Sequence, residues 1–185
     1  MSLLYTFKPS SHYSSPSELL RKLKFHFGDF DYRWTIDFTE SCWFDKSKLG
    51  EDALDWNFKL CGITAATTFN NRDSVICAGR PDINVVNTWQ VVCYINDSKG
   101  GWNASEKPIT LGINDPLIVT MSRKGKQLKF NAYNYNNADE YITETIEVKN
   151  NLYRFIGPYF GGNRKPPHNM DLYVDFDKIK YVTNK

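Results

Sequence analysis

The residues best suited to carboxylate chemistry lie in one segment near the end of the chain. Asp171, Asp175 and Asp177 share one face of a strictly alternating stretch whose other face is apolar. Two carboxylates about 5 Å apart can cleave a glycosidic bond. If the first long strand pairs with this segment, Arg33 and Asp37 come alongside the aspartates. The simpler interpretation is then a solvated outer face with cross-strand charge pairs.

A second set of residue types suits proton transfer next to an acidic group. An arginine or glutamine can neutralise a carboxylate while a tyrosine or histidine moves the proton. Arg80, Gln90, His168 and several tyrosines supply these types. His168 stands between two helix-breaking or loop-forming neighbours, so we expect it to stack or hydrogen-bond locally rather than to transfer protons. We therefore assign no catalytic residue from the sequence.

The spacing of the metal-binding residue types argues against a zinc site. The three histidines are His12, His26 and His168, none at metal-pair spacing, and no C-x-x-C motif occurs. A serine nucleophile elbow and a phosphate-binding glycine loop are also missing from the sequence. We predict no cofactor. Calcium stays open, because its oxygen ligands cannot be recognised from this chain.

Polar and aromatic residues alternate with apolar ones in two predicted strands. In residues 85–95, Gln90 and Tyr94 point away from the apolar face; in residues 127–135, Asn131, Tyr133 and Tyr135 do so. If both strands share one concave sheet, these side chains form a surface that suits a sugar, since aromatic planes stack on sugar rings and amides hydrogen-bond hydroxyls. The alternative is that they cover the sheet or meet another copy of the chain.

Tryptophans divide into two groups by their surroundings. Trp102 follows Gly100 and Gly101, and we expect it at a loop tip, where it can clamp a ligand. Trp34, Trp56 and Trp89 fall on apolar faces and are predicted to lie in the core.

The elements that must position these residues are short strands. Alternation of period two begins at Tyr32 and recurs to Phe176. Strands are predicted in the segments starting at Tyr32 and at 56–69, 74–78, 85–95, 109–113, 117–122, 127–135, 141–148, 152–155 and 171–176. Residues 123–126 are typical of a hairpin turn. About ten short strands with turn signals between them predict an antiparallel sandwich or barrel.

The rest of the chain carries one helix signal and one elaborate loop. Ser15-Pro16-Ser17-Glu18 is typical of a capped helix start and Gly28 of its end. We place an N-terminal extension with a short helix at 1–31 and one β-sandwich domain at 32–185. Glycines and prolines between Ile156 and Met170 predict a loop of special backbone shape that leads into the last strand.

Composition limits the class of protein. The chain has 185 residues, 41% of them hydrophobic and 15% aromatic, with a net charge of +2. The charge is small and scattered, which argues against nucleic acid as partner. No run reaches the roughly 18 apolar residues of a membrane span. The four cysteines are predicted to be free buried thiols rather than two disulfides. The start lacks a secretory signal, so a complete chain is expected in the cytoplasm or a virion.

Two segments carry a family resemblance. The strand DWNFKLCGI at 55–63 and the ending PYFGGN…PPHNMDLYVDF resemble small bacterial and phage-borne members of the concanavalin A-like lectin and glucanase superfamily. The resemblance implies an all-β, antiparallel jelly-roll sandwich. Some members of this superfamily are glycosidases that carry an E-x-D-x-x-E strand, and this chain lacks such a strand. Other sandwich proteins are polysaccharide lyases, and this chain does not match their motifs.

These observations lead to three hypotheses. The first is non-catalytic, lectin-like binding of a glycan or polysaccharide, for which the candidate residues are Arg80, Gln90, Tyr94, Trp102, Asn131, Tyr133, Tyr135 and His168. The second is a structural module that self-associates or joins a virion-type assembly, because aromatic residues also favour protein interfaces. The third is a polysaccharide lyase or glycoside hydrolase using Arg80, His168 and a tyrosine.

Overall fold

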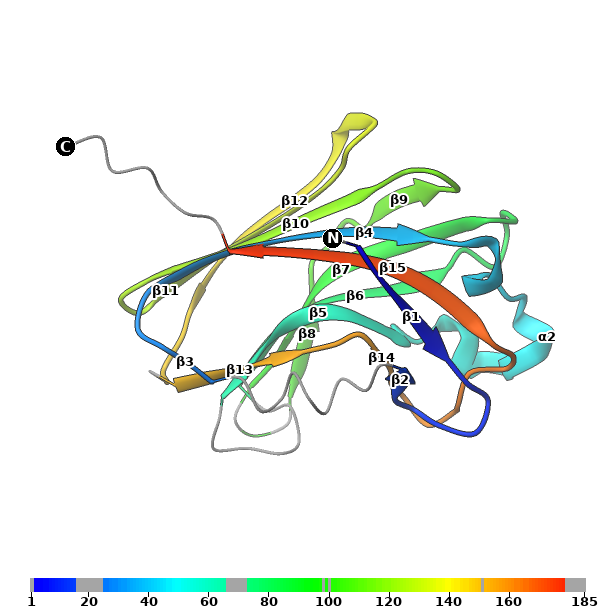
Figure 1. Cartoon of the computed structure of the whole chain (residues 1–185), viewed down its shortest axis with the longest axis horizontal. Coiled ribbons are helices and arrows are strands. Elements are labelled where there is room, and N and C mark those ends of the chain that lie inside the picture. Colours follow the sequence, from blue (N-terminus) through cyan, green and yellow to red (C-terminus); the bar gives the residue numbers. More distant parts are fainter. Residues whose placement is uncertain are drawn as a thin grey trace.

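The chain folds into two antiparallel β-sheets packed face to face, as the alternating sequence predicts (Figure 1). The structure, a computed structural model, describes residues 2–15, 25–65, 73–97, 99, 101–150 and 152–178. Seven strands form the first sheet, in the order β12-β11-β10-β4-β15-β1-β2. Their bounds are β1 Leu3–Phe7, β2 Ser14–Ser15, β4 Phe30–Phe38, β10 Leu117–Lys124, β11 Gln127–Asn134, β12 Asn137–Glu147 and β15 Met170–Lys178.

Eight strands form the second sheet, whose main order is β3-β13-β5-β6-β7-β8. Two short strands extend it, because β14 pairs with β5 and β9 pairs with β7. The bounds are β3 Phe25–Phe27, β5 Phe58–Ala65, β6 Ser74–Pro81, β7 Thr88–Asn96, β8 Trp102–Ala104, β9 Ile109–Gly112, β13 Leu152–Ile156 and β14 Tyr159–Phe160. Both sheets bend the same way, so the outer face of the eight-stranded sheet is concave (Figure 1).

The long strand β4 shows why the sequence folds this way. Every second residue from Phe30 to Phe38 is buried and those between are half-buried. One face of β4 therefore covers the core, while its edges pair with β10 and β15 in the middle of the seven-stranded sheet. The predicted pairing of the first long strand with the last is confirmed, and it sets Arg33 opposite Asp177.

The core between the sheets is rich in aromatic rings. Trp34 and Trp89 are fully buried there, as predicted, and Trp89 stacks on Phe38 with ring centroids 4.9 Å apart. Leu128 and Phe130 of β11 are likewise buried, so their strand presents its other face outward. Burial of this apolar surface is the main stabilising contribution to the fold.

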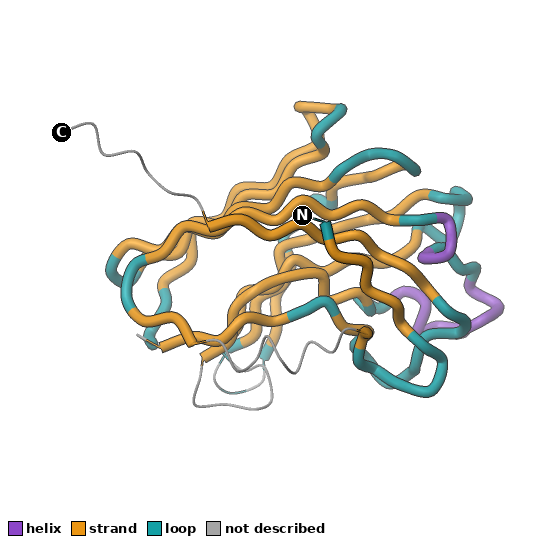
Figure 2. Tube along the Cα trace, in the orientation of Figure 1, coloured by secondary structure: helices purple, strands orange, loops and turns teal. Residues whose placement is uncertain are grey.

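Helical structure in the described residues is confined to one end of the sandwich (Figure 2). It consists of the 3-10 helices Glu40–Cys42 and Gly50–Leu54 and the α-helix α2, Lys46–Leu49, which Asp45 caps by accepting a hydrogen bond from the Ser47 amide. None of these helices is long and apolar enough to cross a membrane. Of the helix predicted between Ser15 and Gly28, residues 16–24 lie outside the described residues, and Phe25–Phe27 is not helical but forms the strand β3.

The N-terminal residues join the sandwich. Leu3–Phe7 is part of the predicted N-terminal extension, but it forms β1 and pairs with β15. Its alternating pattern is only five residues long, which is too short to stand out in the sequence. The short strands β8 and β14 were missed for the same reason.

All four cysteines are free and buried. Cys61, Cys77 and Cys93 lie in register on the adjacent strands β5, β6 and β7 and face the core. Burial raises the pKa of the Cys42 thiol to about 12, so this group stays protonated and unreactive at neutral pH.

Candidate functional site

The concave face of the eight-stranded sheet carries a second apolar cluster, separate from the core. The inward residues of β6 and β7 pack between the sheets, so the residues that alternate with them point outward. Three of these outward-facing residues and one residue of β13 are fully buried, and half-buried aromatic rings pack against them. The buried four are Ile76, Ala78, Val92 and Ile156, and the rings are Trp56, Tyr94 and Tyr159.

Beside this cluster the concave face opens into a hollow of about 640 Å³, which we call the concave groove. The groove combines four aromatic rings with two cations and a few amide and carboxylate groups. Its lining residues are Leu54, Asp55, Trp56, Lys59, Arg80, Tyr94, Asn96, Trp102, Tyr159, Gly162 and Asn163.

Arg80 is held rigidly at one side of the groove. Its guanidinium donates from Nε and Nη2 to the Gln90 side-chain oxygen, at 3.1 and 2.9 Å, and from Nη1 to the Leu54 carbonyl oxygen. The same guanidinium lies 4.3 Å from the centroid of the Trp56 ring, a cation–π contact. Burial lowers the pKa of Arg80, and Asp82 and Asp55 oppose this effect. The group nevertheless stays charged, because free arginine has a pKa above 12.

Lys59 belongs to β5 and lines the same groove as Arg80. Its Nζ is 3.9 Å from the centroid of the Tyr94 ring. Tyr94 in turn stacks on Trp102, with centroids 5.3 Å apart and planes at 11°. Burial lowers the pKa of Lys59 to about 8, although the nearby Asp55 carboxylate partly offsets it. The result is a layered arrangement of ammonium, phenol ring and indole, with the indole outermost and 63% exposed.

The glycine-rich loop predicted from the sequence forms one wall of the groove. Phe160 and Tyr159 pair with β5, so that Tyr159 lies opposite Lys59. The Gly161 amide donates to the Asn57 carbonyl oxygen at 2.6 Å. Gly162 has a φ of 83°, and a Cβ there would come within 2.6 Å of the Asn57 side-chain oxygen. Only glycine fits this close approach.

The structure brings together four of the predicted site residues and separates the others from them. Arg80, Gln90 and Tyr94 share the concave face, and Trp102 joins them. Trp102 begins β8 and is not at a loop tip as predicted, because it pairs with Asn96 at the end of β7. The stacked Tyr94 ring fixes its orientation.

Asn131, Tyr133 and Tyr135 lie elsewhere. They belong to β11 and the turn after it, in the seven-stranded sheet, whereas Gln90 and Tyr94 belong to β7 in the other sheet. The assumption that the two strands share one concave sheet is therefore wrong. Both strands alternate in the same way, and alternation alone does not reveal which sheet a strand joins.

Two further expectations are corrected. Trp56 is not a core residue but half-buried on the concave face, against Arg80 and the outer apolar cluster. His168 lies outside the groove, where its Nε2 donates to the Ser41 carbonyl oxygen at 2.8 Å. The hydrogen bond joins His168 to the first 3-10 helix, 127 residues earlier in the chain, and His168 does not line the groove with Arg80.

Sequence reasoning missed Lys59 and Tyr159. A signal for Lys59 was present, since it stands between the inward residues Phe58 and Leu60 and must therefore point to the opposite face. Tyr159 had no such signal, because its two-residue strand is defined only by pairing with β5.

The aspartate row of β15 lies in the other sheet. Its strand pairs with β4, and Asp171 accepts a hydrogen bond from the Thr6 hydroxyl at 2.5 Å. Asp171 and Asp37 border a hollow of about 660 Å³ beside the first 3-10 helix. The described residues that line this hollow include one aromatic ring, Tyr173, besides Phe38 and no cation. Across the described ranges, no group of three or more histidine, cysteine, aspartate or glutamate side chains is arranged to hold a metal ion.

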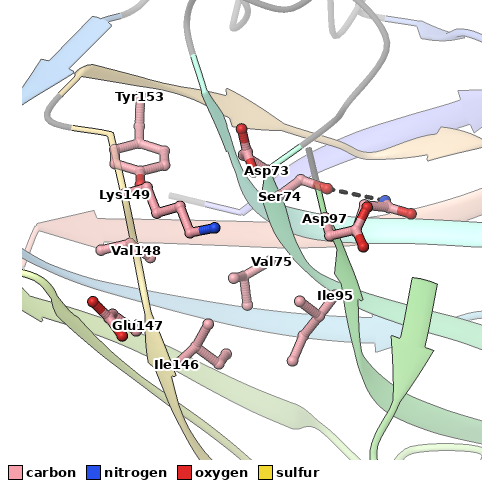
Figure 3. Close-up of a pocket in the computed structure, with 11 residues that line it drawn as sticks. Asp73, Ser74, Val75, Ile95, Asp97, Ile146, Glu147, Val148, Lys149 and Tyr153 are labelled. Carbon is pink, nitrogen blue, oxygen red and sulfur yellow. Dashed lines mark hydrogen bonds between the residues drawn. The ribbon is translucent and has the colours of Figure 1, made fainter. Parts of the chain in front are cut away.

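A smaller cavity, of about 200 Å³, opens between the sheets at the far end of β6 and β7 (Figure 3). Val75, Ile95 and Ile146 point into it, and Tyr153 is its single aromatic ring (Figure 3). The concave groove is larger and offers four rings and two cations, so we place the candidate binding site there.

No protein-family model and no curated protein sequence matches this chain. Solved structures do resemble it. An alginate lyase from Klebsiella pneumoniae matches with a TM-score of 0.58 and 12% identity, over 85% of this chain and 62% of that one. An alginate lyase from Pseudomonas aeruginosa matches with a TM-score of 0.50 and 12% identity, over 82% of this chain and 65% of that one.

A polysaccharide lyase family 18 protein is similar over a larger share, with a TM-score of 0.51 and 9% identity over 97% of this chain and 88% of that one. The chain spans slightly less than two thirds of each alginate lyase. At these identities the likeness establishes the fold alone. The protein is an antiparallel jelly-roll β-sandwich.

The burial of Lys59 should lower the stability of the folded protein. We expect Lys59→Met to raise the free energy of unfolding at pH 7 by on the order of 1 kcal/mol, because it removes a charge that the fold partly desolvates. Above pH 8 the folded protein loses this charge while the unfolded chain keeps it up to about 10.5. The advantage of the variant should therefore shrink between these values. Urea unfolding at several pH values measures it, and a constant difference would contradict the assigned desolvation.

Proposed function

We propose that this protein binds a polysaccharide in the concave groove. The observation that carries the proposal is the Tyr94–Trp102 stack, which leaves a broad indole surface exposed beside fixed polar groups. Sugar rings present C–H faces that pack on such planes, and their hydroxyls need oriented donors and acceptors. Asn96 and Asn163 supply amides in the same groove.

The fold gives further support. The solved structures with similar sandwiches include two alginate lyases and a family 18 polysaccharide lyase, whose names refer to polysaccharides. A fold alone does not carry function, so the proposal depends on the groove. Asn131, Tyr133 and Tyr135 are left out of it, because they face away from the groove in the other sheet.

An enzymatic role is the second candidate, and one observation favours it. Lys59 has a pKa near 8, so part of it is neutral near physiological pH and can accept a proton. Arg80 stands in the same groove to neutralise an acidic group. His168, which the enzyme hypothesis used, is excluded from this arrangement by its position.

The test of binding uses two exposed aromatic residues on opposite faces. We expect Trp102→Ala to weaken binding of a glycan selected from an array at least tenfold. Loss of the exposed stacking ring should reduce the binding free energy by about 1.4 kcal/mol or more. Tyr135→Ala is the matched control, because its side chain is 65% exposed against 63% for Trp102. Titration calorimetry measures both.

Equal loss in the two variants, or loss only in Tyr135→Ala, would place the site elsewhere. Incubating the same glycan with the protein and measuring the ultraviolet absorbance of unsaturated sugar products separates binding from lyase activity. Product formation that stops in Lys59→Met would move the enzymatic role to first place.

A further inference from the structure

The two cations of the concave groove point to the class of its ligand. We infer that the groove binds an acidic polysaccharide, and that the carboxylate of a uronic acid residue lies between Lys59 and Arg80. This inference rests on the proposed glycan binding and goes further by naming the charge and the group that the site recognises.

Lys59 is a cation without an anionic partner. In the part of the chain that the structure describes, no carboxylate lies within 4.0 Å of its Nζ, and the ammonium makes no hydrogen bond there. The ammonium instead makes a cation–π contact with the Tyr94 ring, 3.9 Å from the ring centroid. A half-buried ammonium that is left unpaired is costly unless a ligand supplies the counter-charge.

Arg80 is fixed but only partly used. A guanidinium has five N–H groups. Three of them reach Gln90 and Leu54, and both acceptors are neutral oxygens. Two donors therefore remain for a ligand. Because Trp56 and Gln90 hold the guanidinium in place, a ligand would not have to order it.

The negative groups near the groove do not cancel this charge. Asp55 lies on the lining and acts on both cations, yet it forms an ion pair with neither. Asp82 also acts on Arg80, but it accepts a hydrogen bond from the Gln90 amide at 3.4 Å and does not line the groove. The residues that line the groove include two cations, Lys59 and Arg80, and one carboxylate, Asp55, so the lining has a formal charge of +1.

The surroundings of the cations favour a sugar acid over other anions. Trp102 and Tyr94 place an aromatic stack directly next to Lys59, so an anion bound there is joined to a ring with an apolar face. A guanidinium fork matches the two oxygens of a planar carboxylate. A uronic acid residue combines both features in one unit.

The experiment compares acidic and neutral forms of the same sugar chain. The probes are hexamers of mannuronate, guluronate, galacturonate and glucuronate, each paired with its carboxyl-reduced neutral form, and a sulfated galactan without uronic acid. The variants are Lys59→Met and Arg80→Gln, with Lys129→Met as control. Lys129 is an exposed lysine of β11, on the outer face of the other sheet. Calorimetry at pH 7 gives each affinity, and thermal melting confirms that each variant is folded.

We expect at least one uronate hexamer to bind ten or more times tighter than its neutral form. Lys59→Met and Arg80→Gln should each reduce that affinity at least tenfold, while Lys129→Met leaves it within twofold. Equal binding of the acidic and reduced forms would overturn the inference and leave glycan binding intact. Binding of the sulfated galactan alone would also overturn it. If no probe and no array glycan binds, the proposed function itself fails.

Discussion

Replacing Trp89 by alanine is expected to destabilise the protein by about 3–5 kcal/mol. Trp89 is fully buried at the centre of the core and stacks on Phe38 with planes at 10°. The Trp89 Nε1 also donates a hydrogen bond to the Cys42 carbonyl oxygen at 3.3 Å. The Trp89→Ala variant lacks this donor. Alanine would leave a large cavity and an unpaired buried carbonyl group. Urea unfolding followed by tyrosine and tryptophan fluorescence measures the loss.

Trp102→Ala is the control for this prediction. It removes the same side chain from an exposed position, so its cost should stay below about 1 kcal/mol. Similar losses in the two variants would mean that the eight-stranded sheet is not packed on the core through Trp89. That result would also remove the basis for placing Gln90, its neighbour, on the concave face.

Gly157→Ala is expected to cost about 2–5 kcal/mol, for two separate reasons. Gly157 has a φ of 81°, a left-handed conformation that costs a residue with a Cβ roughly 1–2 kcal/mol. In addition, a Cβ at this position would lie 2.5 Å from the Lys59 carbonyl oxygen and 2.7 Å from that of Leu60. The β5 backbone or the loop must shift, which costs a further 1–3 kcal/mol. Because Lys59 is displaced with its backbone, binding in the groove should weaken as well.

The variant Gly28→Ala measures the cost of the left-handed conformation by itself. Gly28 has a φ of 76°, close to that of Gly157, but a Cβ there would meet nothing within 4 Å. Gly28→Ala should therefore cost only about 1–2 kcal/mol and leave glycan affinity unchanged. Denaturant unfolding and calorimetry on the pair test both effects. If the two variants lost equal stability, the close packing of the loop on β5 would be contradicted.

The alternation of apolar and polar residues predicted several of the long strands correctly. The alternation beginning at Tyr32 became β4 with alternate residues buried, and the segment from Gln127 became β11 with Leu128 and Phe130 inside. Side-chain direction in a strand depends only on position along it, so period two is readable from sequence. The glycines around Tyr159 were also informative, because a positive φ and a close backbone approach exclude other residues.

Pairing between distant strands could not be predicted in the same way. Asn131 and Gln90 both point away from the core, yet they lie on opposite outer faces because β11 and β7 belong to different sheets. The short strands β1 and β14 are strands only because β15 and β5 lie beside them. A two- to five-residue stretch has too little pattern to be recognised alone.

The sequence by itself determined the class of fold, the inward and outward sides of the strands β4, β7, β11 and β15, and the need for glycine in the loop after β13. Only the tertiary structure decided which outward side chains meet. Lys59 comes from β5, Arg80 from β6, Tyr94 from β7 and Trp102 from β8, and the hydrogen-bonded order of these strands creates the groove. Pairing order arises from contacts between residues far apart in the chain, and such contacts leave no periodic trace in a single sequence.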